Sequence, residues 1–278
     1  MITGNPLLVP VLLVLVVSCS GPDTVRTQAV QTGFHEQTLD TGIFNIFSMQ
    51  RVRQTGGEVT IYIEGDGKAF INRGRVSNNP TPDNPLGLKL ALVDNSNNVI
   101  YLARPCQFVK LSQESRCLPV YWTVKRAAPE IIEAMDRAIN NLKMTYGFDH
   151  IRLVGYSGGA TVAAVLAATR SDITDLRTVA GNLDIDRFVR VHDVTPLTGS
   201  VNPTAYAAKL VSIPQLHFLG ANDSVITPDI FIGYTSALKQ AGPSVSCLSL
   251  KTVTGMSHNG SWEAIWPDLN RLPVSCKP

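Results

Sequence analysis

The stretch that most constrains this chain is Gly155-Tyr156-Ser157-Gly158-Gly159, which fits the pattern G-x-S-x-G between two apolar segments. Residues 150–154 predict a short buried strand, and residues 158–170 predict a buried helix. A serine on so sharp a turn between strand and helix projects at the end of the sheet. The glycines keep Cβ atoms out of the turn, and the N–H of Gly158 at the helix start favours a developing oxyanion. The motif therefore predicts that Ser157 is a nucleophile.

Length and charge narrow the choice of architecture and partner. The chain has 278 residues, 44% of them hydrophobic, and a net charge of +2. Its length is enough for one full-sized domain with a large core. The nearly neutral net charge gives no electrostatic reason to expect a nucleic-acid partner.

Strand and helix patterns alternate along most of the chain, which predicts an α/β fold with a doubly wound, mostly parallel sheet. Alternating apolar residues in 34–52 favour an antiparallel strand pair at the sheet edge, whereas residues 184–214 show no clear strand and predict a small inserted cap. Further strands are expected at residues 59–63, 98–103, 176–180, 216–220 and 247–253, and helices at 86–93, 128–146, 228–241 and 261–269.

A serine hydroxyl needs a base to take its proton and an acid to orient that base. The elbow motif resembles that of the α/β-hydrolase fold, in which the acid and then the histidine follow the serine along the chain. Asp223 directly follows an apolar strand, and His258 lies just past the last one. They are the predicted acid and base, and Asp184, after the preceding strand, is the alternative acid. His217 inside a strand is expected to pack in the core, and His192 in the cap could touch substrate.

The oxyanion hole needs a second backbone N–H, from the loop after the strand at residues 59–63. That loop reads Glu64-Gly65-Asp66-Gly67, with Glu64 where histidine is common in the family. By position the N–H of Asp66 is the expected donor beside that of Gly158, with Gly67 next. The alternative is a plain turn, because Asp-Gly is itself a turn signal.

The cysteines suggest export. Cys106, Cys117, Cys247 and Cys276 make an even set without metal-ligand spacing, which suggests disulfides and no metal. Of the three possible connectivities we favour Cys106–Cys117 and Cys247–Cys276, the shorter closures. The first bridge would stiffen the segment that includes Gln107 and Trp122. These two side chains could position substrate, but we favour a purely structural role for the segment.

The N-terminus also predicts export. The apolar run at residues 7–17 has the length of a signal-peptide core and ends in Val16-Val17-Ser18-Cys19, which resembles a bacterial lipobox. We expect a lipoprotein signal peptide over residues 1–18, lipidation of Cys19, a polar tether over 19–32 and the folded domain over 33–278. Simple secretion with Cys19 discarded is the alternative.

Together with Arg104-Pro105-Cys106-Gln107, residues 180–184 and residues 196–200, these motifs resemble bacterial α/β-hydrolase lipoproteins. The resemblance implies a serine hydrolase that acts on a carboxylic ester, or on a thioester or amide, without metal or cofactor. Its partners would be a small-molecule or acyl substrate and the membrane that holds its lipid. Ser20 rather than Asp after Cys19 favours the periplasmic face of the outer membrane. The alternative function is a non-catalytic binding or envelope-assembly module.

Overall fold

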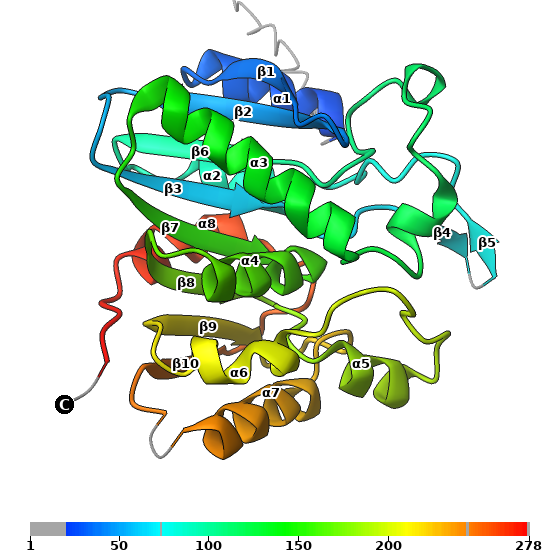
Figure 1. The fold of residues 1–278 in the computed structure, drawn as a ribbon, viewed down its shortest axis with the longest axis vertical. Coiled ribbons are helices and arrows are strands. Elements are labelled where there is room, and N and C mark those ends of the chain that lie inside the picture. Colours follow the sequence, from blue (N-terminus) through cyan, green and yellow to red (C-terminus); the bar gives the residue numbers. More distant parts are fainter. Residues whose placement is uncertain (1–20, 73, 243–244, 277–278) are drawn as a thin grey trace, which may run out of the picture.

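The computed structural model describes residues 21–72, 74–242 and 245–276, which form a mixed eight-stranded sheet with helices on both faces (Figure 1). The strand order is β1-β2-β6-β3-β7-β8-β9-β10. β2 pairs antiparallel with β1 and β6, and the strands from β6 to β10 in that order run parallel. The strands span His35–Asp40 (β1), Asn45–Val52 (β2), Glu58–Ile63 (β3), Asn98–Leu102 (β6), His150–Tyr156 (β7), Ile173–Val179 (β8), Gln215–Gly220 (β9) and Leu248–Val253 (β10). The predicted fold class and its antiparallel edge pair are confirmed.

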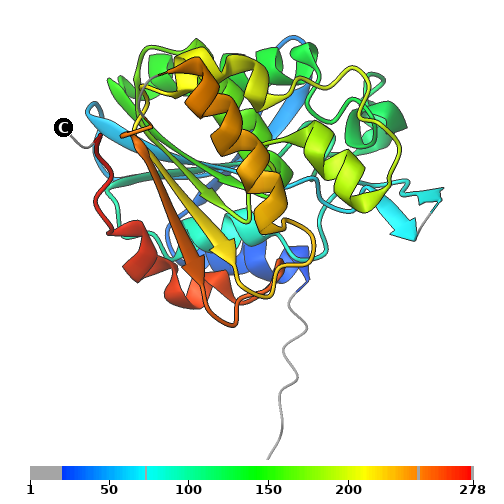
Figure 2. The ribbon, with the colours of Figure 1, turned by 90° about the horizontal axis from the view of Figure 1, so that it is seen from below.

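The helices form two layers, seen on opposite sides of the sheet in Figure 2. One layer holds α3, α4, α6 and α7, whose apolar residues share a core with one face of the sheet. The other holds α1, α2 and α8. The α-helices span Pro22–Gln31 (α1), Leu86–Leu92 (α2), Pro129–Tyr146 (α3), Gly158–Thr169 (α4), Ile185–His192 (α5), Ala207–Leu210 (α6), Pro228–Ala241 (α7) and Trp262–Asn270 (α8). Short 3₁₀ turns span Leu111–Gln113, Pro119–Trp122 and Pro203–Tyr206.

The central unit is β7 followed by α4. Every residue of α4 from Gly158 to Ala168 is buried, so the helix is apolar on all sides rather than amphipathic. Helix α3, which packs on α4, instead has a clear apolar stripe and ends at Gly147 with a φ of 72°. The sequence distinguishes the buried helix from the half-buried one because their apolar patterns differ.

The expected tether over residues 19–32 is wrong for the part that the structure describes. Residues 22–31 form helix α1, which begins at Pro22, and Val25 and Ala29 on it are buried against the sheet. Two apolar residues four apart make too narrow a stripe to show as helical periodicity in a polar segment. Cys19 and the expected signal peptide lie outside the described residues. No helix in the described ranges is both long and apolar enough to span a membrane.

The expected insertion over residues 184–214 divides into two parts. Ala207 and Leu210 of α6 are buried in the layer beside α4, so this end belongs to the core of the α/β domain. Helix α5 and residues 193–202 lie at the carboxyl ends of the parallel strands. There they share one end of the molecule with a hairpin that the sequence analysis did not predict, β4 (Phe70–Asn72) and β5 (Arg75–Val76) (Figure 1).

Both disulfides pair as favoured. Cys106 joins Cys117, and Cys247 joins Cys276. The first closes the loop that follows β6, and the second ties the chain just before β10 to the segment after α8. Each restricts the unfolded chain and therefore stabilises the fold.

Candidate active site

Ser157 stands on the turn between β7 and α4 in a strained conformation. Its φ is 51° and its ψ is −121°, a region that residues with a Cβ rarely adopt. The neighbouring glycines allow the turn: a Cβ on Gly155 would lie 2.5 Å from the Cα of Ala160, and one on Gly159 would overlap the carbonyl of Ile63. The predicted elbow geometry is therefore present, and only these residue types permit it.

His258 lies between Ser157 and Asp223. Its Nε2 is 3.0 Å from the Ser157 Oγ, and its Nδ1 is 2.9 Å from the Asp223 Oδ2. The loop that carries His258 is fixed through its backbone carbonyl, which accepts hydrogen bonds from the Tyr156 hydroxyl and the Trp262 indole N–H. Three residues from three loops thus form one hydrogen-bonded chain at the carboxyl ends of the strands.

Asp223 is held on both sides. Its side chain has no solvent-exposed surface. The Oδ1 accepts hydrogen bonds of 2.8 Å from the N–H groups of Val225 and Ile226, while the Oδ2 faces the imidazole. The same carboxylate therefore closes its own turn and orients the histidine.

Asp184, the alternative acid, has a different place. Its Oδ1 caps helix α5 by accepting a hydrogen bond from the N–H of Arg187, and it also accepts from the Asn202 amide. Asp184 is the helix N-cap here, while Asp223 contacts His258.

The loop after β3 passes over the serine. A Cβ on Gly65 would lie 3.3 Å from the Ser157 Cβ. Glu64 anchors this loop to the start of α2, because its carboxylate accepts hydrogen bonds from the N–H groups of Gly65 and Gly87 and from the Tyr101 hydroxyl. Burial raises the pKa of Glu64, and these hydrogen bonds offset part of that effect.

The Asp66 side chain turns back onto the elbow and meets two arginines. Its Oδ2 is 2.8 Å from Arg126 and its Oδ1 is 3.4 Å from Arg104. Burial alone would raise the pKa of Asp66, but the two guanidinium groups outweigh burial and lower it. A Cβ on Gly158 would overlap this carboxylate, so glycine is required there. In the sequence Arg104 stands out only as part of the motif Arg104-Pro105-Cys106-Gln107, with no role indicated, and Arg126 does not stand out at all.

Arg104 and Gln107 brace the same loop from the far side. The Arg104 guanidinium donates to the carbonyl of Gly158 over 3.2 Å, and the Gln107 amide donates to the carbonyl of Gly65 over 3.0 Å. Gln107 is 1% exposed. Trp122 is buried and donates to the carbonyl of Ser77. The loop stapled by Cys106–Cys117 thus supports the site, and neither Gln107 nor Trp122 opens toward solvent.

The other histidines lie away from the serine. His217 is fully buried in β9, as expected, between the Thr178 hydroxyl and the Gln215 side chain. His192, at the end of α5, hydrogen-bonds the carbonyl of Val225 over 2.7 Å. It therefore joins the cap to the Asp223 loop. Among the described residues, no group of three or more histidine, cysteine or acidic side chains gathers in a way that could hold a metal ion.

Solved structures that resemble this chain, all at low sequence identity, include esterases. An esterase from Pyrococcus furiosus superposes with a TM-score of 0.59 at 12% identity, covering 86% of this chain and 89% of its own. Est1E from Butyrivibrio proteoclasticus gives a TM-score of 0.55 at 12% identity over 84% of this chain and 95% of its own. A protein of unknown function from Agrobacterium tumefaciens, described as an α/β-hydrolase, gives a TM-score of 0.56 at 14% identity. The match covers 88% of this chain and 100% of that protein. The chain has the α/β-hydrolase fold.

One protein-family model matches part of the sequence. Residues 104–241 match the model of the family described as Serine hydrolase (FSH1). The matched segment is just under half of the chain and contains Ser157 and Asp223, so this part of the chain is similar to that family. No curated protein sequence matches the chain.

Proposed function

We propose that this protein is a serine hydrolase that cleaves a carboxylic ester through Ser157, His258 and Asp223. The observation that carries the proposal is the continuous arrangement of the Ser157 hydroxyl, the His258 imidazole and the Asp223 carboxylate, with hydrogen-bond distances of 3.0 and 2.9 Å. A base within hydrogen-bond reach of the nucleophile and oriented by a third group is the arrangement that serine catalysis requires.

The first half of the reaction forms an acyl-enzyme. His258 Nε2 takes the proton of the Ser157 hydroxyl as Oγ attacks the carbonyl carbon, and the carbonyl oxygen becomes an oxyanion. The imidazolium then gives its proton to the leaving alcohol as the ester bond breaks. In the second half, His258 removes a proton from water, the water oxygen attacks the acyl carbon, and Ser157 leaves with the proton returned.

The N–H groups of Gly158 and Asp66 are the donors that we assign to the oxyanion. Gly158 stands at the N-terminus of α4, where backbone N–H groups lack partners within the helix. Gly67 is the weaker second candidate, since a Cβ on it would be directed at the Pro80 carbonyl and the Gln107 amide rather than at Ser157. Removing one such donor typically costs about 10²–10³ in kcat.

The substitution Ser157→Ala tests the proposal. It should abolish hydrolysis of p-nitrophenyl acetate while leaving the thermal midpoint nearly unchanged, and Ser224→Ala, at an exposed serine beside Asp223, should retain activity. A fluorophosphonate probe should label the wild-type protein at Ser157, because covalent labelling requires an activated serine. Retained hydrolysis in Ser157→Ala would refute the assignment. Folded wild-type protein that resists the probe would favour the non-catalytic binding module.

We further propose that the protein is exported and lipid-anchored at Cys19, on the periplasmic side of the outer membrane. Support comes from the apolar run at residues 7–17, the lipobox-like sequence before Cys19 and the two disulfides, which persist in oxidising compartments. The intact mass of the mature protein should show cleavage before Cys19, an added lipid and two disulfides. Four free thiols with Met1 retained would place it in the cytoplasm instead.

A further inference from the structure

A cavity of about 640 Å³ opens between the β4–β5 hairpin and the cap. The β4–β5 hairpin and helix α5, which supply part of its lining, lie at the end of the molecule toward which the parallel strands run (Figure 1). Its volume is within the range of sites that bind small organic ligands. The lining residues used below are Phe70, Val124, Arg126, Phe188, His192 and Val194.

Two of these residues connect the cavity directly to the candidate site. Arg126 forms an ion pair of 2.8 Å with Asp66, whose backbone N–H is the assigned oxyanion donor. His192 hydrogen-bonds the carbonyl of Val225, and the N–H of Val225 holds the Asp223 carboxylate. One lining residue therefore contacts the oxyanion loop, and another contacts the acid loop.

Apolar side chains from three different segments face this cavity. Phe70 comes from the hairpin, Val124 from the loop before α3, and Phe188 and Val194 from the cap. Phe70 and Val194 are each 44% exposed, so they leave apolar surface open that a ligand would cover. Polar side chains also line the cavity, namely Asn72, Thr123, Arg126, His192, Asp193 and Thr195, so the lining combines apolar surface with groups that can orient a ligand.

We propose that this cavity binds the apolar arm of the ester substrate, so that the enzyme prefers esters whose acyl or alcohol group is longer than acetyl or ethyl. The inference rests on the proposed function and adds the substrate class to it. Each methylene that the cavity buries should raise kcat/KM by about fourfold until the cavity is filled, since burial contributes about 0.8 kcal/mol per CH₂ and 1.36 kcal/mol is a factor of ten.

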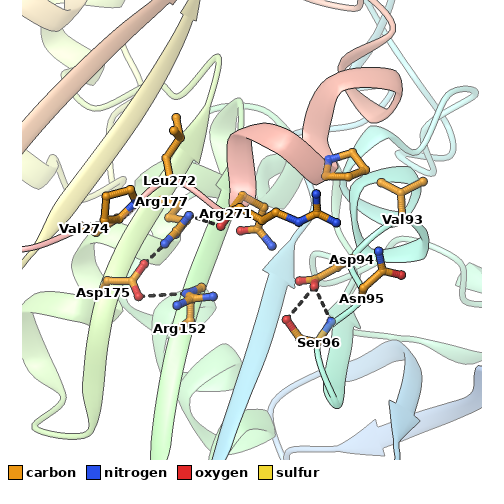
Figure 3. A pocket seen from close by; sticks show the side chains of 13 residues that line it. Val93, Asp94, Asn95, Ser96, Arg152, Asp175, Arg177, Arg271, Leu272 and Val274 are labelled. Carbon is orange, nitrogen blue, oxygen red and sulfur yellow. Dashed lines mark hydrogen bonds and ion pairs between the residues drawn. The ribbon is translucent and has the colours of Figure 1, made fainter.

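The other large pocket is unsuited to this role. It has a volume of about 530 Å³ and is lined by charged side chains, among them Arg152, Asp175, Arg177 and Asp94 (Figure 3). Arg152 and Asp175 stand near the amino ends of β7 and β8, opposite the edge that carries Ser157. An acyl chain placed there could not reach the nucleophile.

The chain offers a matched pair of substitutions on each of two walls. Phe70 lines the cavity, whereas its neighbour Ile71, 47% exposed in the same strand, is not among the lining residues. On the cap, Val194 lines the cavity, whereas Val191, 39% exposed, does not. All four side chains are exposed, so a substitution by Asp should be tolerated at each of them.

The experiment measures kcat/KM for two ester series, p-nitrophenyl acetate to octanoate and ethyl to octyl acetate, in the wild type and these four variants. We expect kcat/KM of the wild type to rise with chain length in one series, which identifies the arm that the cavity binds. Phe70→Asp and Val194→Asp should lower kcat/KM for the longest ester at least tenfold more than for the shortest ester. Ile71→Asp and Val191→Asp should retain the rise.

A wild type that shows no rise in either series overturns the inference, as does a rise that survives in both cavity variants or is lost equally in the controls. Failure of the proposed function is a different result: no hydrolysis of the shortest esters and no fluorophosphonate label on Ser157. The two failures are therefore distinguishable on the same protein.

Discussion

The side-chain amide of Gln107 donates a hydrogen bond of 3.0 Å to the backbone carbonyl of Gly65, although 42 residues separate them in the chain. The side-chain oxygen of Gln107, Oε1, accepts a hydrogen bond from the backbone N–H of Arg104. The Gly65 carbonyl and the Asp66 N–H belong to one planar peptide group, so Gln107 fixes the peptide that carries the assigned oxyanion donor. The stapled loop after β6 thereby sets the position of the loop after β3.

Replacing Gln107 should therefore reduce kcat more than it weakens substrate binding. In Gln107→Ala the Gly65 carbonyl loses its partner and the oxyanion loop can shift, and a displacement of about 1 Å costs on the order of 10² in rate. We expect kcat for p-nitrophenyl acetate to fall by about that factor with KM within threefold, and fluorophosphonate labelling of Ser157 to slow. Gln113→Ala, at an exposed glutamine of the same loop, is the control. Equal kinetics in the two variants would show that Gln107 does not position the loop.

The two candidate acids should separate by assay. Asp223→Asn removes the charge that orients His258 and should lower kcat by up to about 10⁴. Asp184→Asn changes the N-cap of α5, where Asn is also a good cap, so its activity and stability should stay close to wild type. Measured kcat and thermal midpoints decide between them, and the reverse ranking of kcat would assign the acid role to Asp184.

The positions of Ser157, Asp223 and His258 could be predicted because each lies in a loop that follows a predicted strand. Parallel strands bring their carboxyl ends to one edge, so three loops distant in sequence meet there. Their order along the chain then selects Asp223 and His258 from the other acids and histidines. Local pattern and topology were sufficient for this part of the site.

Arg104 and Arg126 could not be predicted, because their contacts depend on tertiary structure. They lie 38 and 60 residues from Asp66 and reach it with long side chains whose direction no local pattern indicates. The β4–β5 hairpin was missed for another reason: its strands, Phe70–Asn72 and Arg75–Val76, are too short to show alternation. The parts missed by sequence analysis are thus the support of the oxyanion loop and one wall of the proposed substrate cavity.

Stability should fall in mild acid because of His217. Burial lowers the pKa of this imidazole to about 3 from an ordinary value of 6.5, and the aromatic rings of Phe231 and Tyr234 pack against it. Between these two pH values the unfolded chain binds a proton that the folded chain does not, so stability is present above pH 6.5 and is lost as the pH falls toward 3. The loss between pH 6.5 and pH 4 should be on the order of 3 kcal/mol.

Urea unfolding at pH 7 and pH 4.5 measures this contribution. The difference in unfolding free energy between the two pH values should shrink in His217→Gln, because glutamine stays neutral, even though the variant is less stable at pH 7. His150→Gln, at an exposed histidine, should behave as the wild type does. The same pH difference in wild type and His217→Gln would rule out His217 as its source.

The charged pocket of Figure 3 should govern stability rather than catalysis. There Asp175 accepts hydrogen bonds of 2.9 Å from Arg152 and 2.8 Å from Arg177, and its side chain is 8% exposed. Asp175→Asn would remove the carboxylate that pairs with the buried Arg177 and leave Arg152 with Glu58, 3.8 Å away. Breaking a buried pair in this way costs about 3–5 kcal/mol. Glu133→Gln, which breaks an exposed pair with Arg137 on α3, should cost no more than about 0.5 kcal/mol. Denaturant unfolding measures the loss of stability in both variants. The kcat of the folded Asp175→Asn protein should match that of the wild type, because the pocket lies at the opposite edge of the sheet from Ser157. A loss of kcat in folded protein with little loss of stability would show that this pocket acts on the reaction after all.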